Sequence, residues 1–114
     1  MRMLANLKEP LRCNPKDLVY KIVLHEIDSG VYVYLYTSPD AVLSSFDMFY
    51  EYKADALEDW QDAVGEWQPL DDPLPYCQHD ALLPIRVKGR DTGSPKWGEY
   101  EILKDGKWID YKPN

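Results

Sequence analysis

The chain has 114 residues, a net charge of −7 and two cysteines, and 45% of its residues are hydrophobic. This length and composition predict one folded domain, 1–114, rather than a disordered chain or a disulfide-stabilised scaffold. No apolar run approaches the roughly 18 residues of a membrane span, and the first residues lack the apolar region of a signal peptide. We therefore expect a cytoplasmic protein that has no membrane partner.

The negative charge is concentrated in the middle of the sequence. Residues 40–80 contain eleven acidic residues and one basic residue, Lys53, which gives this segment a net charge of −10. Nucleic acids and anionic lipid surfaces bind clusters of Lys and Arg, so the acidic segment disfavours both as partners. It favours a basic protein partner, because opposite fields speed association.

The first 37 residues predict an arm followed by a β-hairpin. Residues 1–17 contain several turn-forming residues, which favour an irregular N-terminal arm. Residues 18–27 and 31–37 are rich in β-branched and aromatic residues, and they flank a short glycine-containing turn. We therefore predict that these two segments pair as antiparallel strands.

Residues 38–52 fit two alternatives. Ser38-Pro39 could begin a helix, whereas the alternation of apolar and other residues over 46–52 is typical of a strand. We favour a short turn and then a third strand.

The helical pattern is strongest over 54–64. Leu57, Trp60 and Val64 share one face of a helix, and we expect that face to pack on a sheet. Gly65 is suited to end the helix. The opposite face carries an acidic ridge of four carboxylates: Asp55, Glu58, Asp59 and Asp62.

The last third of the chain predicts a loop, a strand and a second hairpin. Residues 67–76 contain three prolines and predict an extended loop. Residues 82–88 alternate as a strand does, and Asp105-Gly106 lies between two further strands over 99–111. The expected fold class is α+β: one antiparallel sheet, made of two hairpins and a middle strand, packed against one amphipathic helix.

The first functional hypothesis is a non-enzymatic protein-interaction module that binds a basic partner. The acidic ridge and the proline-rich acidic loop would form its binding surface over 55–80, although such a ridge can also serve solubility alone. In composition the chain resembles small, acidic, aromatic-rich bacterial proteins that neutralise a toxin, which implies an immunity or inhibitor role. The expected partner-binding residues are Asp55, Glu58, Asp59, Asp62, Asp71 and Asp72.

The second hypothesis is a small enzyme or an anion-binding domain. Arg86, Lys88 and Arg90 alternate along the predicted strand, so their side chains would share one face. Together with the 67–80 loop they could line a pocket for an anionic ligand. The alternative is that the three cations pair with the acidic loop inside the same domain.

The tyrosines of the first hairpin leave a further choice open. Tyr32, Tyr34 and Tyr36 would lie on one face of their strand, opposite Val31, Val33 and Leu35. Both faces of the hairpin are thus largely apolar. The tyrosine face is covered by the protein itself or is open to a partner.

Cys77-Gln78-His79-Asp80 is the only cluster of side chains suited to a metal or to thiol chemistry. Paired Cys-x-x-Cys or His-x-x-x-His spacings are absent, and an extended chain does not bring Cys77 into obvious contact with His79. We therefore predict free thiols and no metal site, catalytic residue or cofactor.

Overall fold

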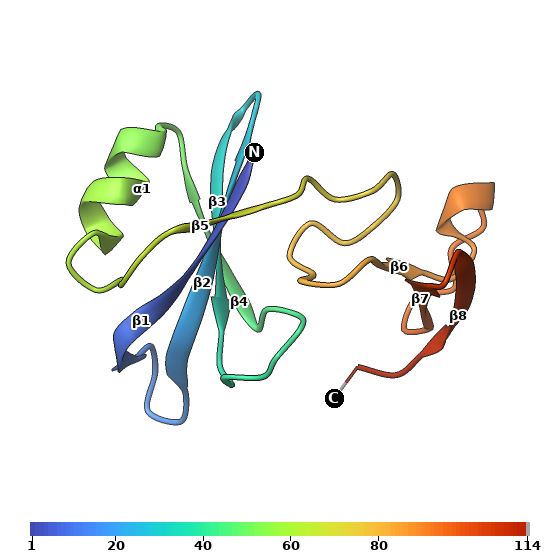
Figure 1. The fold of residues 1–114 in the computed structure, drawn as a ribbon, viewed down its shortest axis with the longest axis horizontal. Helices are drawn as coiled ribbons and strands as arrows, with labels where there is room; N and C mark the ends of the chain where they lie inside the picture. Colours follow the sequence, from blue (N-terminus) through green and yellow to red (C-terminus); the bar gives the residue numbers. More distant parts are fainter. Residues whose placement is uncertain (114) are drawn as a thin grey trace. The chain divides into compact units, whose positions relative to one another are not determined.

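A computed structural model describes residues 1–113 of the chain (Figure 1). The structure has two compact units: the first spans Met1–Asp72 and the second begins at Pro73. Each unit contains one antiparallel sheet, and the single α-helix of the described chain belongs to the first. The predicted α+β class is confirmed, but the strands are divided between two sheets instead of sharing one.

The first unit is a five-stranded sheet with a helix packed on one face (Figure 1). Its strand order is β4-β3-β2-β1-β5. The elements are β1 (Arg2–Arg12), β2 (Leu18–Ile27), β3 (Gly30–Tyr36), β4 (Phe46–Tyr50), α1 (Lys53–Trp60) and β5 (Gln68–Leu70). The core lies between α1 and the sheet, where alternate residues of β1, β2 and β3 meet Ala56 and Trp60.

Two strand predictions for this unit are confirmed. β2 and β3 form the expected hairpin, in which Ile27 is paired with Gly30 across a two-residue turn. The uncertain segment 38–52 contains strand β4 and no helix before residue 53. Its pairing with β3 places Phe46, Met48 and Tyr50 on the face that carries α1, because they oppose core residues of β3.

The predicted irregular arm over 1–17 is wrong, because most of it is strand β1. The first part of β1 pairs with β2 in regular register and buries Ala5 and Leu7 in the core. The register then shifts between Asn6 and Leu11, and this irregularity accommodates Pro10. Turn-forming residues therefore mark a bulge within the strand rather than the absence of one.

Helix α1 is shorter than the predicted 54–64. It ends at Trp60, with Gln61 as C-cap, and Gly65 does not cap it. The chain instead turns back to β1: Val64 forms an isolated bridge with Leu7, and the Gly65 N–H donates to the Asn6 carbonyl at 3.0 Å. Backbone pairing with the sheet thus replaces the last helical turn.

Part of the predicted proline-rich loop is strand β5, which pairs with the start of β1. Pro69 is in this strand, and a proline is compatible with an edge strand, where its missing N–H would face away from the sheet. β5 and β4 are the two edges of the sheet.

The second unit has a three-stranded sheet of order β6-β7-β8. Its elements are β6 (Ile85–Val87), the 3₁₀ helix η1 (Arg90–Thr92), β7 (Tyr100–Lys104) and β8 (Lys107–Tyr111). The predicted hairpin is confirmed: Asp105 and Gly106 both have positive φ, 52° and 78°, as a type I′ turn requires. Among residues 1–113, no helix is long and apolar enough to cross a membrane.

Candidate functional site

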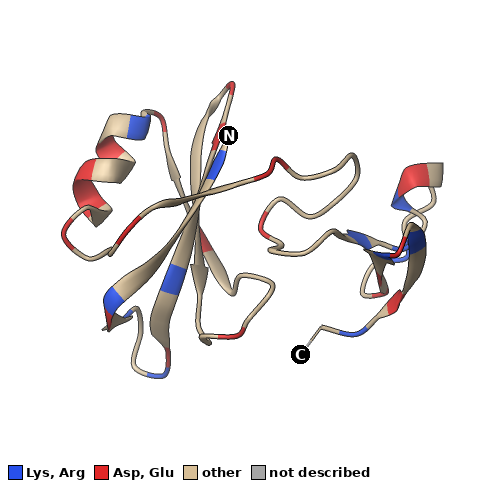
Figure 2. Cartoon of the chain, in the orientation of Figure 1, with Lys and Arg blue, Asp and Glu red and all other residues tan. Residues whose placement is uncertain are grey.

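Helix α1 presents the acidic ridge to solvent. Asp55 lies in its first turn, Glu58 and Asp59 in its last turn, and Asp62 just beyond it, and all four side chains are exposed. The opposite side of the helix buries Ala56 and Trp60. Acidic positions mark the exposed helix in Figure 2, whereas the only basic position on it is Lys53 at its start. The structure therefore brings four of the six predicted partner-binding residues together.

Most of the acidic ridge opposes the stability of the helix that carries it. The exception is Asp55 in the first turn, where the helix dipole favours a negative charge. Asp55 and Asp59 are four residues apart, as are Glu58 and Asp62, and like charges at this spacing repel on a helix. The last turn has no basic residue, so Glu58 and Asp59 also lie at the negative end of the helix dipole. These carboxylates are thus not explained by the stability of α1.

Asp59 links the ridge to the edge of the sheet. Its Oδ2 accepts a hydrogen bond from the Tyr50 hydroxyl at 2.9 Å, which joins α1 to the last residue of β4. Burial, and then the bond to Asp59, raise the pKa of Tyr50. Lys53 leaves the ridge uncompensated, because its Nζ lies 3.9 Å from Glu26 of β2.

Asp71 and Asp72 lie beside the start of the chain. The Asp71 carbonyl accepts a hydrogen bond from Nε of Arg2 at 2.7 Å. The Asp72 carboxylate is 3.0 Å from the amino group of Met1, and this hydrogen bond lowers the pKa of Asp72. Asp72 therefore already has a cationic partner, unlike the ridge.

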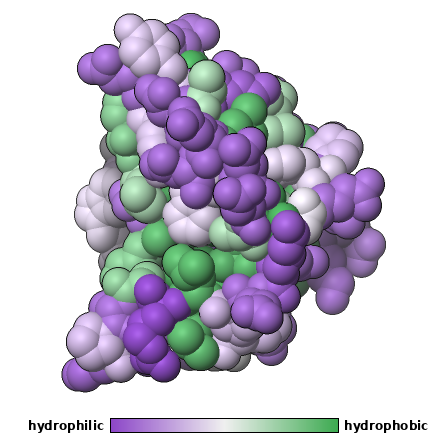
Figure 3. Space-filling view, turned by 90° about the vertical axis from the view of Figure 1, so that its left-hand side faces the viewer, coloured by the Kyte–Doolittle hydropathy of each residue, from purple (hydrophilic) through white to green (hydrophobic). Residues whose placement is uncertain are grey.

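An apolar patch accompanies the ridge. Phe46 and Met48, on the α1 side of β4, are each 41% exposed. Figure 3 shows the face of the molecule that carries α1, with a hydrophilic band above and a hydrophobic patch below. The first residues of β4 lie at the lower end of the sheet, below α1 (Figure 1). Charged and apolar groups thus share one face of the first unit.

The other face of this sheet holds the predicted tyrosine row. Tyr34 and Tyr36 are buried, and Tyr32 stacks on Tyr34 with ring centroids 5.8 Å apart. The cross-strand neighbours of this row, which we had not selected as site residues, include buried Lys21 and His25 of β2. Lys21 and His25 alternate with core residues along β2, and this pattern could have identified them as polar residues on the opposite face of the sheet.

Lys21 shows how this face satisfies a buried cation. Its Nζ donates to the Pro39 carbonyl at 2.8 Å and lies 5.6 Å from the centroid of the Tyr36 ring. Desolvation lowers the pKa of Lys21, and the nearby Asp40 carboxylate opposes that shift.

In the second unit Arg86 lies within a compact ionic cluster. Its Nε donates to Oε1 of Glu101 at 2.6 Å, and a terminal nitrogen lies 3.5 Å from the Asp91 carboxylate. The guanidinium also lies 3.8 Å from the centroid of the Trp108 ring. Arg86 and Glu101 side chains are each only 13% exposed, so this ion pair is largely shielded from water.

Lys88 lies on the same face as Arg86, because its partner Asp110 is opposite Glu101 in the register of β7 with β8, but each cation has its own carboxylate. Nζ of Lys88 donates to the Asp110 carboxylate at 2.9 Å, which raises the pKa of Lys88. Arg90 lies in η1 and donates to Oε1 of Gln78 at 3.3 Å. An anion near these cations would have to compete with carboxylates for Arg86 and Lys88, and anion binding stays a prediction.

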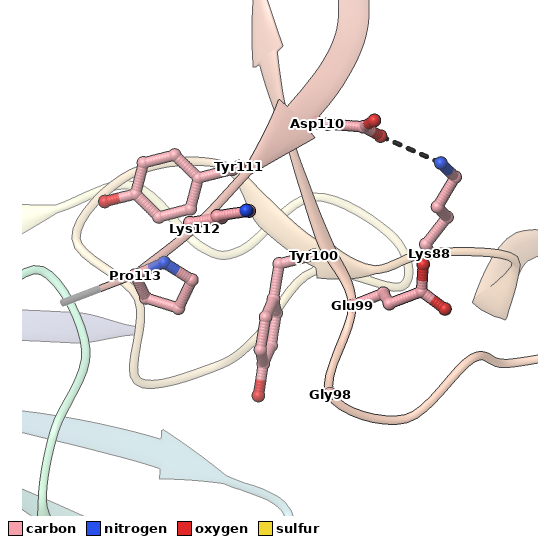
Figure 4. Close-up of a pocket in the computed structure, with 8 residues that line it drawn as sticks. All are labelled: Lys88, Gly98, Glu99, Tyr100, Asp110, Tyr111, Lys112 and Pro113. Carbon is pink, nitrogen blue, oxygen red and sulfur yellow. Dashed lines mark hydrogen bonds and ion pairs between the residues drawn. The ribbon is translucent and has the colours of Figure 1, made fainter.

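A hollow of about 450 Å³ lies beside Lys88 (Figure 4). It is lined by Lys88, Gly98, Glu99, Tyr100, Asp110, Tyr111, Lys112 and Pro113. Two cations and two carboxylates therefore contribute no net charge, and neither Arg86 nor the 67–80 loop is in the lining. This hollow shares only Lys88 with the anion pocket that the sequence suggested.

Cys77 is buried and forms an isolated β-bridge with Arg86, whereas Cys13 is exposed. Among residues 1–113, neither cysteine forms a disulfide bond. No group of three or more His, Cys, Asp and Glu side chains between residues 1 and 113 is arranged to hold a metal ion.

Comparison with known proteins gives no relative. No protein-family model matches this sequence, and neither a curated protein nor a solved structure is significantly similar to it.

Proposed function

We propose that the protein is a non-enzymatic binding module that docks on a basic protein through the acidic ridge of α1. The observation that carries this proposal is that four carboxylates project into solvent from one short helix and the residue after its C-cap, and that Glu58 and Asp59 lie at the negative end of the helix dipole, where they lower its stability. Exposed charge that costs helix stability is well suited to attracting an oppositely charged surface. An immunity or inhibitor role agrees with this chemistry.

The apolar patch gives the ridge a second source of affinity. Charge complementarity mainly accelerates association, whereas burial of apolar and aromatic groups supplies most of the binding energy at protein interfaces. Phe46 and Met48 lie on the same side of the sheet as α1 and are partly exposed. A basic partner that has a few apolar side chains would engage both.

The test compares proteins captured from host lysate at roughly 0.05 M and 0.5 M salt, a range over which exposed charges become screened. A ridge variant carries Asp55→Asn, Glu58→Gln, Asp59→Asn and Asp62→Asn. We expect the wild-type chain to retain a basic protein at low salt, and the ridge variant to lose it.

A matched control variant keeps the ridge and removes four exposed carboxylates elsewhere: Glu9→Gln, Asp28→Asn, Glu99→Gln and Asp105→Asn. It has the same net charge as the ridge variant, so it separates a local surface from overall charge. The proposal fails if the two variants lose the same proteins, or if the ridge variant loses none.

A further inference from the structure

Strand β4 offers an open edge beside the acidic ridge. In the β2–β3 hairpin, the Ile27 and Gly30 pair closes a two-residue turn, so the even-numbered residues of β3 bond to β2. The Leu35 carbonyl accordingly faces β4, where it accepts the Ser45 N–H at 2.9 Å. The backbone N–H and C=O groups of Phe46, Met48 and Tyr50 therefore face β3. Those of the two residues between them face outward.

The outward-facing donors and acceptors belong to Asp47 and Phe49. β4 is the outermost strand of its sheet, and among residues 1–113 no backbone hydrogen bond is found to these two residues at that edge. Both side chains are exposed, Phe49 by 49%. Unpaired edge groups of this kind are a template for a strand from another chain.

The edge is held in a fixed geometry. A Cβ at Gly30 would lie 2.5 Å from Cζ of Phe49 and 2.6 Å from the Tyr50 carbonyl oxygen, so only glycine allows this approach. The Phe49 ring also meets Tyr32 edge-on, with centroids 5.1 Å apart. At this same end β4 is tied to α1 by the Tyr50 and Asp59 hydrogen bond. A strand added here would meet a preorganised edge.

The charges around β4 select the kind of strand that fits. Asp47 is exposed on one side of the strand, Glu51 follows its end, and the ridge begins at Asp55, with Lys53 as the sole basic residue of 40–62. A second copy of this chain would bring a second acidic helix to the edge, which like-charge repulsion disfavours. An extended basic segment is complementary.

We propose that the basic partner adds a β-strand to the open edge of β4. This inference rests on the proposed function and specifies how the partner docks. The added strand bonds to Asp47 and Phe49, places apolar side chains against Phe46 and Met48, and places Lys or Arg against Asp47.

The probe for this mode is the peptide acetyl-Lys-Val-Lys-Val-Lys-Val-Lys-amide, N-methylated on alternate residues so that it can pair along only one edge. The readout is amide hydrogen exchange of the full chain, followed by NMR. We expect saturating probe to slow exchange at Asp47 and Phe49 by roughly tenfold or more, since new backbone bonds protect amides. The same peptide methylated at every amide keeps its charge and should protect neither.

Two variants separate strand addition from simple charge attraction. Asp47→Lys should weaken probe binding about tenfold, because it puts a like charge at the edge. Asp28→Lys makes the same charge change in the β2–β3 turn and should leave affinity unchanged.

Binding that depends on the ridge but leaves exchange at Asp47 and Phe49 unaltered would overturn strand addition while the proposed function stands. Strand addition would also be overturned if the probe does not bind. The same holds if both amides are already protected without probe because the chain forms a dimer. If both amides are protected and the ridge variant binds the probe equally well, the role of the ridge in docking is refuted while strand addition stands.

Discussion

The two units stabilise their sheets in different ways. The first unit buries an apolar layer between α1 and the sheet, in which Ile22, Leu24 and Val33 are fully inaccessible. The second unit buries Ile85 and Val87 on one face of β6, but the other face is organised by Arg86 and its carboxylate and aromatic partners. A unit that begins at Pro73 is close to the size of about 40 residues below which apolar burial alone rarely suffices.

Ionic and cation–π contacts therefore contribute a larger share of the stability in the unit that has the smaller apolar core. Stabilisation by buried apolar area is not subject to charge screening by salt, whereas that of an ion pair is, to the extent that the pair is exposed. Each of the following variants tests whether the two units depend on different kinds of contact.

Leu24→Ala has the largest expected effect. Leu24 is fully buried in the core beneath α1, and truncating such a side chain leaves a cavity. We expect the free energy of unfolding of the first unit to fall by about 3 kcal/mol, independently of salt. Urea titration followed by NMR signals of residues 1–72 measures it, and a loss below about 1 kcal/mol would contradict a tightly packed core.

Arg86→Met should cost the second unit about 2 kcal/mol, less than for a fully buried pair because Arg86 and Glu101 retain some exposure. Glu101 would be left shielded without its partner. The double variant Arg86→Met and Glu101→Met should regain most of the loss, since it removes both charges. Equal losses in the single and double variants, measured in the same titration, would show that packing on Trp108 matters more than the ion pair.

Tyr50→Phe should cost about 0.5 kcal/mol near neutral pH, because an exposed hydrogen bond to Asp59 contributes little. The pKa of Tyr50 is raised in the folded state, so its protonated hydroxyl stabilises the fold below pH 10, its ordinary value. That stabilisation is lost as pH rises through the folded pKa. Stability profiles from pH 8 to 12 should therefore fall less steeply for the variant, and parallel profiles would contradict the raised pKa of Tyr50.

Lys88→Met has the smallest expected effect. Its ion pair with Asp110 is short but lies in solvent, with the Asp110 side chain 79% exposed. Exposed pairs of this kind add little to stability, so the urea midpoint of the second unit should not change measurably. A loss comparable to that of Arg86→Met would show that exposure does not distinguish the two ion pairs.

Local signals made part of the fold predictable from sequence. Both hairpins follow from short turns, Asp28-Ser29 and Asp105-Gly106, whose residues favour chain reversal whatever lies elsewhere. Strand β1 was missed because Pro10 and other turn-forming residues suggested irregular structure, although β1 and β2 form a hairpin in which Arg12 is paired with Leu18. The pairing of β1 with β5 is non-local and could not be read from sequence. Because sequence does not show which distant strands pair, we predicted one sheet where the structure has two.

The candidate site was predictable to the extent that it lies on one helix. The exposure of the acidic ridge follows from helical spacing around Trp60, and the structure retains it although α1 is shorter than expected. The partners of Arg86 were not predictable, because Glu101 is fifteen residues away and meets it only through the register of β6 with β7. Nor could sequence show that Asp72 faces the amino terminus.

Pro69 in β5 bears on how many partner strands the sheet can bind. β5 bonds to β1 through residues on either side of Pro69, so the missing N–H falls on the outer edge of the sheet. One edge can therefore accept a strand, while the opposite edge is interrupted. If a partner strand adds at β4, we therefore expect a one-to-one complex, because Pro69 disfavours growth of the sheet at its other edge.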